Sequence, residues 1–67
     1  MNEITLRAQI EEIDYELGQR KNVYARLVGA GKMRQSIADL HCARLRAARA
    51  TLERVQAQDD LMRQRLA

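Results

Sequence analysis

His41 and Cys42 are the side chains of this sequence best suited to catalysis near neutral pH, because an imidazole titrates there and a thiolate is a nucleophile. The two residues are adjacent, so on a helix their side chains point in different directions and do not converge on one substrate. One Cys and one His are also too few for a zinc site, which needs three or four ligands. We therefore predict no catalytic residue, no metal site and no cofactor. His41 is interpreted as a residue of a helix seam and Cys42 as a small packed side chain, with a reactive thiol as the alternative for Cys42.

The segment Gly29-Ala30-Gly31-Lys32 has a superficial likeness to a phosphate-binding loop. Such a loop follows a strand and has the pattern G-x-x-x-x-G-K-[ST], whereas here Met33 replaces the hydroxyl residue and the preceding segment has the pattern of a helix. Glycine adopts the positive φ that ends a helix. We therefore predict a turn at about residues 29–34.

Two long helices are predicted on either side of this turn, at about residues 2–28 and 35–66. The chain has no proline and is rich in Ala, Leu, Arg, Gln and Glu, a composition typical of long helices and coiled coils. Apolar residues recur at alternating spacings of three and four, which indicates a helix seam. The first seam comprises Leu6, Ile10, Ile13, Leu17, Tyr24 and Leu27, and the second comprises Ala38, His41, Leu45, Ala48, Leu52, Val55, Met62 and Leu66. Arg20 and Asp59 interrupt these seams. Either these polar residues fix the register or the choice of partner helix, or the seam opens to solvent at their level.

These elements predict an all-α fold, an antiparallel two-helix hairpin of the coiled-coil type. Folding back about the turn places residues opposite each other whose numbers sum to about 65, such as Ile13 and Leu52. Ser36 and Asp39 are predicted to form a capping box at the start of the second helix. Further apolar residues widen the two stripes beyond a two-helix contact: Ile4, Val23, Val28, Ile37, Leu40 and Leu61. A chain of 67 residues with one cysteine buries little apolar surface, so we expect a homodimer that forms a four-helix bundle.

Charge is uneven along the chain although the net charge is only +3. Residues 1–17 hold five acidic residues against one arginine, residues 18–49 hold eight basic residues against one aspartate, and residues 50–67 are balanced. A hairpin brings both flanks of the turn to one end, which we therefore predict to be strongly basic. Such an end attracts phosphate or acidic protein surfaces, and the alternative is a solvated face that favours solubility.

No basic segment followed by an apolar stretch occurs near Met1, and no run of eighteen apolar residues occurs anywhere. These features predict a cytoplasmic protein that makes no membrane contact.

A set of residues around the turn has a characteristic spacing: Arg20, Val23, Tyr24, Arg26, Val28, Gly31, Lys32, Met33, Gln35, Ala38 and Asp39. With this set, about a third of the chain resembles a family of small phage and prophage proteins of proteobacteria. The chain departs from the family at Ala25, where proline is usual, and at Arg34, where the family has Ser or Thr. The resemblance implies an accessory protein made in the host cytoplasm during infection. Small helical phage proteins of this kind commonly bind and disable a host factor, such as a transcription regulator, a motor ATPase or a defence complex.

Our first functional prediction is a non-enzymatic accessory protein that modulates or inhibits a host protein. The residues expected to bind that partner are apolar and basic and lie near the turn: Val23, Tyr24, Arg26, Lys32, Met33 and Leu40. Tyr24 has an alternative interpretation as a core residue with its hydroxyl at the rim.

The alternatives are a nucleic-acid-binding accessory protein and a structural coiled-coil component that needs neither surface. Under the nucleic-acid hypothesis, the residues predicted to contact phosphate are Arg20, Lys21, Arg26, Lys32, Arg34, Arg44, Arg46 and Arg49. Proteins that read single strands usually place several aromatic side chains among such residues, and that pattern is missing here.

Overall fold

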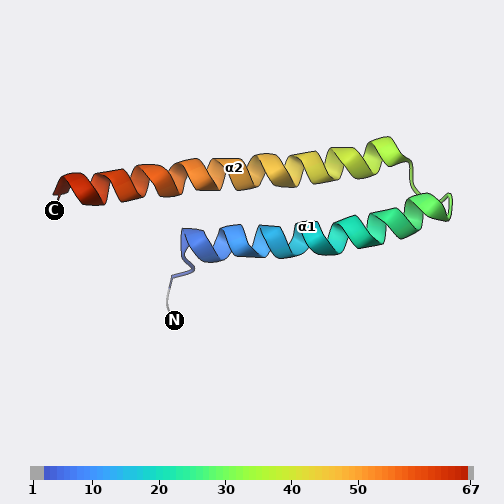
Figure 1. Ribbon diagram of the computed structural model, residues 1–67, viewed down its shortest axis with the longest axis horizontal. Coiled ribbons are helices and arrows are strands. Elements are labelled where there is room, and N and C mark those ends of the chain that lie inside the picture. The colour runs from blue at the N-terminus through green and yellow to red at the C-terminus, as the bar shows by residue number, and fades with distance from the viewer. Residues whose placement is uncertain (1–2, 67) are drawn as a thin grey trace.

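The computed structural model describes residues 3–66 and consists of two long antiparallel helices joined by a tight turn (Figure 1). Helix α1 runs over Leu6–Gly29 and helix α2 over Gln35–Leu66. The molecule is an elongated rod that measures 55 × 26 × 13 Å. The predicted all-α helical hairpin is therefore confirmed, and the described residues form a single layer of two helices.

Helix α1 begins at Leu6, later than the predicted start near residue 2, which itself lies outside the described residues. The reason is an N-cap at Thr5, whose backbone is extended and whose hydroxyl oxygen accepts a hydrogen bond from the Ala8 N–H at 3.0 Å. This bond satisfies one of the N–H groups that a helix start leaves without a partner. The Gln9 side chain adds a bond to the Ile4 carbonyl oxygen at 3.3 Å and holds the entering chain in place.

The turn ends α1 through two backbone hydrogen bonds that converge on its last turn. The Lys32 N–H donates to the Leu27 carbonyl oxygen at 2.8 Å, and the Gly31 N–H donates to the Val28 carbonyl oxygen at 3.0 Å. This pair of bonds is a Schellman motif, which needs a left-handed residue just beyond the helix. Gly31 supplies that residue with a φ of 72°, as the sequence predicted for a glycine in this segment.

Helix α2 begins at Gln35, but the capping box predicted for Ser36 and Asp39 is wrong. Ser36 already lies inside the helix, so its side chain cannot cap the start. The Asp39 carboxylate instead accepts a hydrogen bond from the Gln35 side-chain amide at 2.9 Å. The Arg34 carbonyl oxygen accepts from the Ile37 N–H at 3.1 Å, so the first helical bond starts two residues before the predicted cap at Ser36 would allow.

The predicted register, in which facing residue numbers sum to about 65, is confirmed by two contacts between the helices. Arg49 forms an ion pair with Asp14 at 2.6 Å. Farther toward the turn, the rings of Tyr24 and His41 lie with their centroids 6.0 Å apart. Because these contacts are about ten residues apart on α1, they fix the register over much of the rod.

The seam of α1 is the predicted one, whereas the seam of α2 is rotated. All six predicted seam residues of α1 are buried or half-buried. On α2, three of the predicted seam residues, Ala38, Leu45 and Leu52, are buried or half-buried. The other five predicted seam residues are exposed: His41, Ala48, Val55, Met62 and Leu66. The side chains that face α1 form what we call the inner row of α2: Ala38, Cys42, Leu45, Arg49, Leu52 and Gln56. The apolar stripe of α2 is wider than one neighbouring helix can cover, so α1 covers one edge and leaves the other open.

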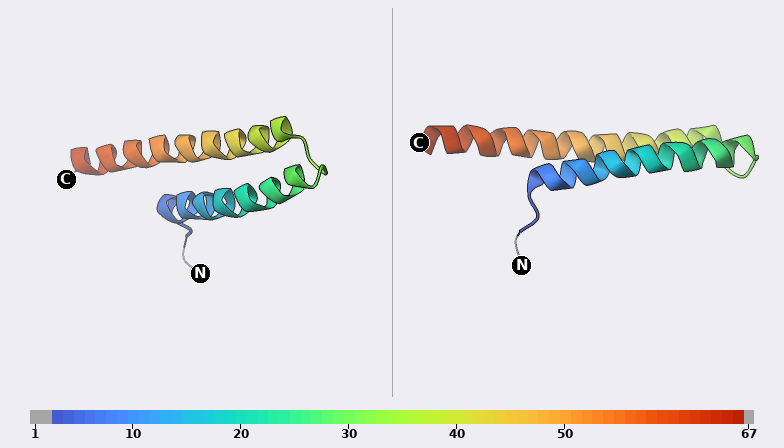
Figure 2. Two further views of the ribbon diagram at one scale, coloured as in Figure 1. Left: turned by 45° about the vertical axis from the view of Figure 1, so that its right-hand side comes forward. Right: turned by 60° about the horizontal axis from the view of Figure 1, so that its bottom comes forward.

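The two helices bury little. Ile10 and Ala38, with exposed fractions of 8% and 4%, are the buried residues of the described chain. Helix α2 has 32 residues against 24 in α1, and its C-terminal end extends past the start of α1 in every view (Figures 1 and 2). Met62 and Leu66 on this overhang are 61% and 84% exposed.

Candidate protein-interaction surfaces

One side of α2 carries a row of exposed residues at helical spacing, which we call the flank row. Its members are Ile37, His41, Arg44, Ala48, Val55, Asp59, Met62 and Leu66, and each is exposed. At 3.6 residues per turn, the row lies roughly a quarter turn around α2 from the inner row. Four of its members belong to the exposed large apolar residues of the chain, so the row offers an apolar surface along the length of α2.

Near the turn, the flank row continues into a shallow hollow between the two helices. The hollow is lined by Arg20, Tyr24, His41, Arg44 and Leu45, which places Arg20 beside Arg44 and Leu45 as the register predicted. Glu16 forms an ion pair with Arg20 at 3.3 Å, four residues along the same helix. Arg44 has no ion pair among the described residues. The seam interruption at Arg20 therefore opens onto solvent beside a second arginine.

The opposite side of the hairpin is held by a charged cluster. Arg49 binds both carboxylate oxygens of Asp14, with Nε and Nη2 at 2.6 and 3.2 Å, and its Nη1 lies 2.7 Å from Glu53. The hydrogen bond from Arg49 lowers the pKa of Asp14 below its ordinary value of 3.8. The same bond raises the pKa of Arg49, so both groups stay charged at neutral pH. Sequence reasoning missed this pair, although the numbers 14 and 49 fit the predicted register.

The six residues predicted to bind a protein partner lie around the turn end but do not form one continuous surface. Val23, Tyr24 and Met33 are half-buried. Tyr24 packs between the helices against His41, in agreement with its interpretation as a core residue at the rim. The other three, Arg26, Lys32 and Leu40, are exposed. Arg26 comes two positions after Tyr24 and Leu40 two positions after Ala38, so each points away from the contact between the helices.

The eight basic residues predicted to contact phosphate lie on several sides of the rod, from the turn to its middle, where Arg49 lies. Arg49 and Arg20 are already engaged by Asp14 and Glu16. Two further cations, Lys21 and Arg46, line one groove between the helices, on the side of the rod opposite to the hollow that contains Arg20 and Arg44. The remaining ones are exposed: Arg26, Lys32 and Arg34. The basic character of the turn end is as predicted, but its charges do not line a single channel.

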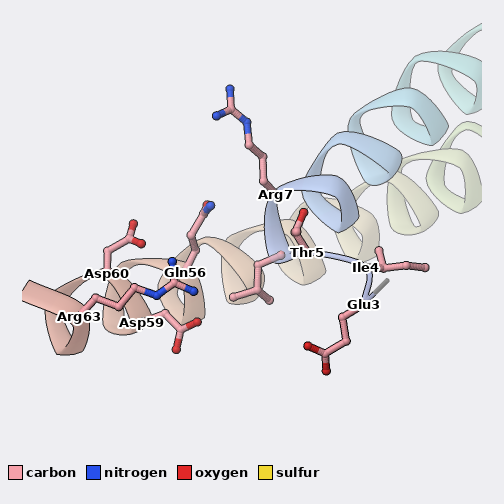
Figure 3. Close-up of a pocket in the computed structure, with 9 residues that line it drawn as sticks. Glu3, Ile4, Thr5, Arg7, Gln56, Asp59, Asp60 and Arg63 are labelled. Carbon is pink, nitrogen blue, oxygen red and sulfur yellow. The ribbon is translucent and has the colours of Figure 1, made fainter. Parts of the chain in front are cut away.

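At the other end of the rod, a hollow lies where α1 begins and α2 continues alone (Figure 3). Asp59 and Asp60 line it together with Glu3, Arg7 and Arg63. The second seam interruption, Asp59, therefore lies beside the start of α1, and it has no ion pair among residues 3–66. Three acidic and two basic side chains line this hollow, in contrast to the basic turn end.

No group of three or more His, Cys, Asp or Glu side chains among the described residues is arranged to hold a metal ion. Over residues 3–66, neither helix has a stretch both long enough and apolar enough to cross a membrane. Cys42 is half-buried in the inner row and lines the groove that also contains Lys21 and Arg46.

In comparisons with protein-family models, curated proteins and solved structures, no match to this chain was found.

Proposed function

We propose that this chain is a non-enzymatic protein-binding module that acts as a homodimer of hairpins. The observation that carries the proposal is the mismatch between apolar content and burial. Only Ile10 and Ala38 are buried within the described chain, whereas eight large apolar residues are at least 41% exposed. A surface of this kind favours association with another polypeptide, because apolar side chains gain free energy when they are removed from water.

Self-association is the first part of the proposal. A short chain that buries so little gains stability most directly by covering its apolar stripe with a second copy, as in four-helix bundles built from two hairpins. Sedimentation velocity at a series of concentrations tests this part. We expect one species with twice the chain mass at micromolar concentration, and a folded species with the mass of one chain at every concentration would contradict the proposal.

Binding of a second protein is the other part. The residues proposed for it are the exposed Arg26, Lys32 and Leu40 at the turn end, together with the half-buried Val23, Tyr24 and Met33. Mixed apolar and cationic side chains suit a partner with an acidic rim around an apolar spot. The resemblance of the turn segment to small phage proteins makes a host protein the proposed partner and the host cytoplasm the proposed place of action.

Affinity capture from host lysate with paired variants tests this second part. Arg26→Glu combined with Leu40→Ser changes exposed side chains at the turn end and leaves the helix interface intact. The matched control, Glu12→Arg combined with Leu61→Ser, changes exposed residues of α1 and α2 away from the turn. A protein captured by the wild type and the control but lost with the turn-end variant supports the proposal. Equal capture by all three chains contradicts the assignment of the turn end.

Nucleic-acid binding is a second candidate, favoured by the pairs of cations that line grooves on two sides of the turn end, Lys21 with Arg46 and Arg20 with Arg44. Contacts of this kind bind phosphates and release counterions, so affinity falls steeply as salt concentration rises. A salt titration with double-stranded and single-stranded DNA and RNA tests it. Absence of binding at about 50 mM salt, where phosphate contacts are weakly screened, would remove this candidate.

A further inference from the structure

The flank row of α2 has a spacing that is symmetric about a point between Thr51 and Leu52. Moving outward from this point, Ala48 and Val55 come first, at equal distances on either side. Arg44 and Asp59 follow, then His41 and Met62, and finally Ile37 and Leu66, and the two numbers in each pair sum to 103. A row with this property can pair with an identical row that runs in the opposite direction, because each residue then meets its symmetry mate from the other copy.

The residue types in the row agree with such pairing. Ile37 would face Leu66 of the partner subunit, and Ala48 would face Val55 of the partner subunit, so apolar groups meet apolar groups. The charged positions are complementary, because Arg44 would face Asp59 of the partner subunit and Asp59 would face Arg44 of the partner subunit. Neither Arg44 nor Asp59 has an ion pair within the described residues of one chain.

On this basis, which rests on the homodimer proposed above, we propose that two copies pair through the flank rows of their α2 helices. The helices run antiparallel, the two-fold axis passes between Thr51 and Leu52, and Arg44 of each copy binds Asp59 of the other.

The exposure pattern supports this choice of partner. Of the eight exposed large apolar residues, Ile37, Val55, Met62 and Leu66 lie in the flank row, at 42%, 41%, 61% and 84% exposure. The antiparallel arrangement lays the overhang of α2 against the turn-proximal part of the partner's α2, where Ile37 and His41 are exposed. A second copy therefore covers the end of α2 that α1 is too short to reach.

The arrangement also changes the charge around Arg44. In one chain, Arg44 shares a hollow with Arg20, and none of the five residues that line the hollow is acidic. Asp59 from a second copy brings a carboxylate to Arg44, which has no ion pair within the described residues of one chain, whereas Arg20 is already paired with Glu16. The two residues that interrupt the predicted seams, Arg20 and Asp59, are thereby brought to the same level of the dimer.

Cysteine crosslinking tests the position of the axis. In a Cys42→Ser background, Thr51→Cys places a thiol next to the two-fold axis, at a distance from its own symmetry mate that a disulfide can span. We expect near-complete crosslinked dimer after mild oxidation at micromolar concentration. The control Ala50→Cys is also exposed but lies on the far side of α2 from the flank row, so it should give little dimer.

A pair of cysteine variants tests the direction of the helices. A mixture of His41→Cys and Met62→Cys chains, again with Cys42→Ser, should give mainly the mixed crosslink in an antiparallel pair. Each variant alone should crosslink weakly, because its own symmetry mate is far away along the rod. Crosslinking of each variant with itself in preference to the mixture would show a parallel pair and overturn the inference.

A charge swap tests the proposed ion pair. Arg44→Asp alone and Asp59→Arg alone each place like charges opposite one another, so we expect the dimer dissociation constant to rise by roughly tenfold. The combined variant restores opposite charges and should recover most of the wild-type affinity. Arg46→Asp is the control, because it makes the same change of charge in the groove on the other side of α2 from the flank row. It should leave the dimer dissociation constant nearly unchanged.

These outcomes separate the inference from the proposal on which it rests. If sedimentation shows a dimer but Thr51→Cys does not crosslink and the charge swap gives no rescue, the dimer stands and the flank-row arrangement is wrong. If the chain has the mass of one copy at every concentration, both fail.

Discussion

Arg49 of α2 binds Asp14 of α1 through two hydrogen bonds, of 2.6 and 3.2 Å, and this pair is the one ion pair between the helices in the described residues. It lies at the middle of the rod on the side away from the flank row. Arg49 occupies an inner-row position that a leucine or alanine fills in most coiled coils. The contact thus fixes which edge of the wide α2 stripe turns toward α1 and which edge stays open.

Replacing Asp14 with Asn should lower the thermal stability of the hairpin in a pH-dependent way. The pKa of Asp14 is lowered in the folded state by Arg49, so its stabilising effect is present above the ordinary pKa of 3.8 and is lost as pH falls through the lowered value. Circular dichroism melts at pH 7 and near pH 2 measure this. The melting temperature of Asp14→Asn should be below that of the wild type at pH 7, and the gap should close at the lower pH. A gap that stays constant across this range would show that the charge of Asp14 is irrelevant.

Replacing Thr5 with Ala should destabilise α1 by about 1 kcal/mol, the usual cost of losing an N-cap side chain. The bond from the Ala8 N–H to the Thr5 hydroxyl, at 3.0 Å, has no substitute in that variant. Urea unfolding followed by circular dichroism provides the measurement. Ser36→Ala is the matched control, because Ser36 lies inside α2 and is exposed, so its replacement should change the free energy of unfolding by less than about 0.5 kcal/mol. A larger loss of stability in Ser36→Ala than in Thr5→Ala would show that Ser36 caps α2 after all.

Alanine substitutions at two glycines should act in opposite directions. Gly31 has a φ of 72°, and a side chain there costs about 1–2 kcal/mol even though no heavy atom lies within 4 Å of the added Cβ. Gly18 lies inside α1, also with no atom within 4 Å, so Gly18→Ala should stabilise the helix by about 1 kcal/mol. Equal effects of the two substitutions in urea unfolding would contradict the left-handed turn at Gly31.

Sequence reasoning predicted the helices, the turn and the register because each depends on a local or periodic signal. The spacing of Ile10, Ile13 and Leu17 defines one face of α1 without ambiguity, and Gly31 supplies the backbone conformation that the turn requires. The start of α1 was missed because Thr5 has no Glu or Gln three residues later to mark it as a cap.

The facing side of α2 was harder to predict because α2 offers two adjacent rows of usable residues. One row contains Cys42 and Arg49, and the other contains His41 and Ala48. The apolar pattern favours the row with His41 and Ala48, because the row with Cys42 is interrupted by Arg49. The folded hairpin uses the first row, because Arg49 finds its partner in Asp14, and no single-helix pattern contains that information. The flank row, through which we propose self-association, was predicted in large part as the seam toward α1 for the same reason, since the pattern of one helix does not tell which of its two rows the other helix covers.

Replacing Val55 with Asp should weaken self-association more than any other single change in the flank row. Val55 is 41% exposed in one chain and lies close to the proposed axis, so the symmetry of the pair places the change in the interface twice. Each lost apolar contact costs about 1.5–3 kcal/mol when the side chain would otherwise be fully buried, and a carboxylate adds a desolvation cost. We therefore expect the dimer dissociation constant, measured by sedimentation equilibrium, to rise by about a hundredfold or more. Ala57→Asp is the control, because Ala57 is exposed on the opposite side of α2 and the same charge there should leave the dimer intact. Equal weakening by the two variants would mean that added negative charge on α2, and not loss of the flank-row contact, controls the assembly.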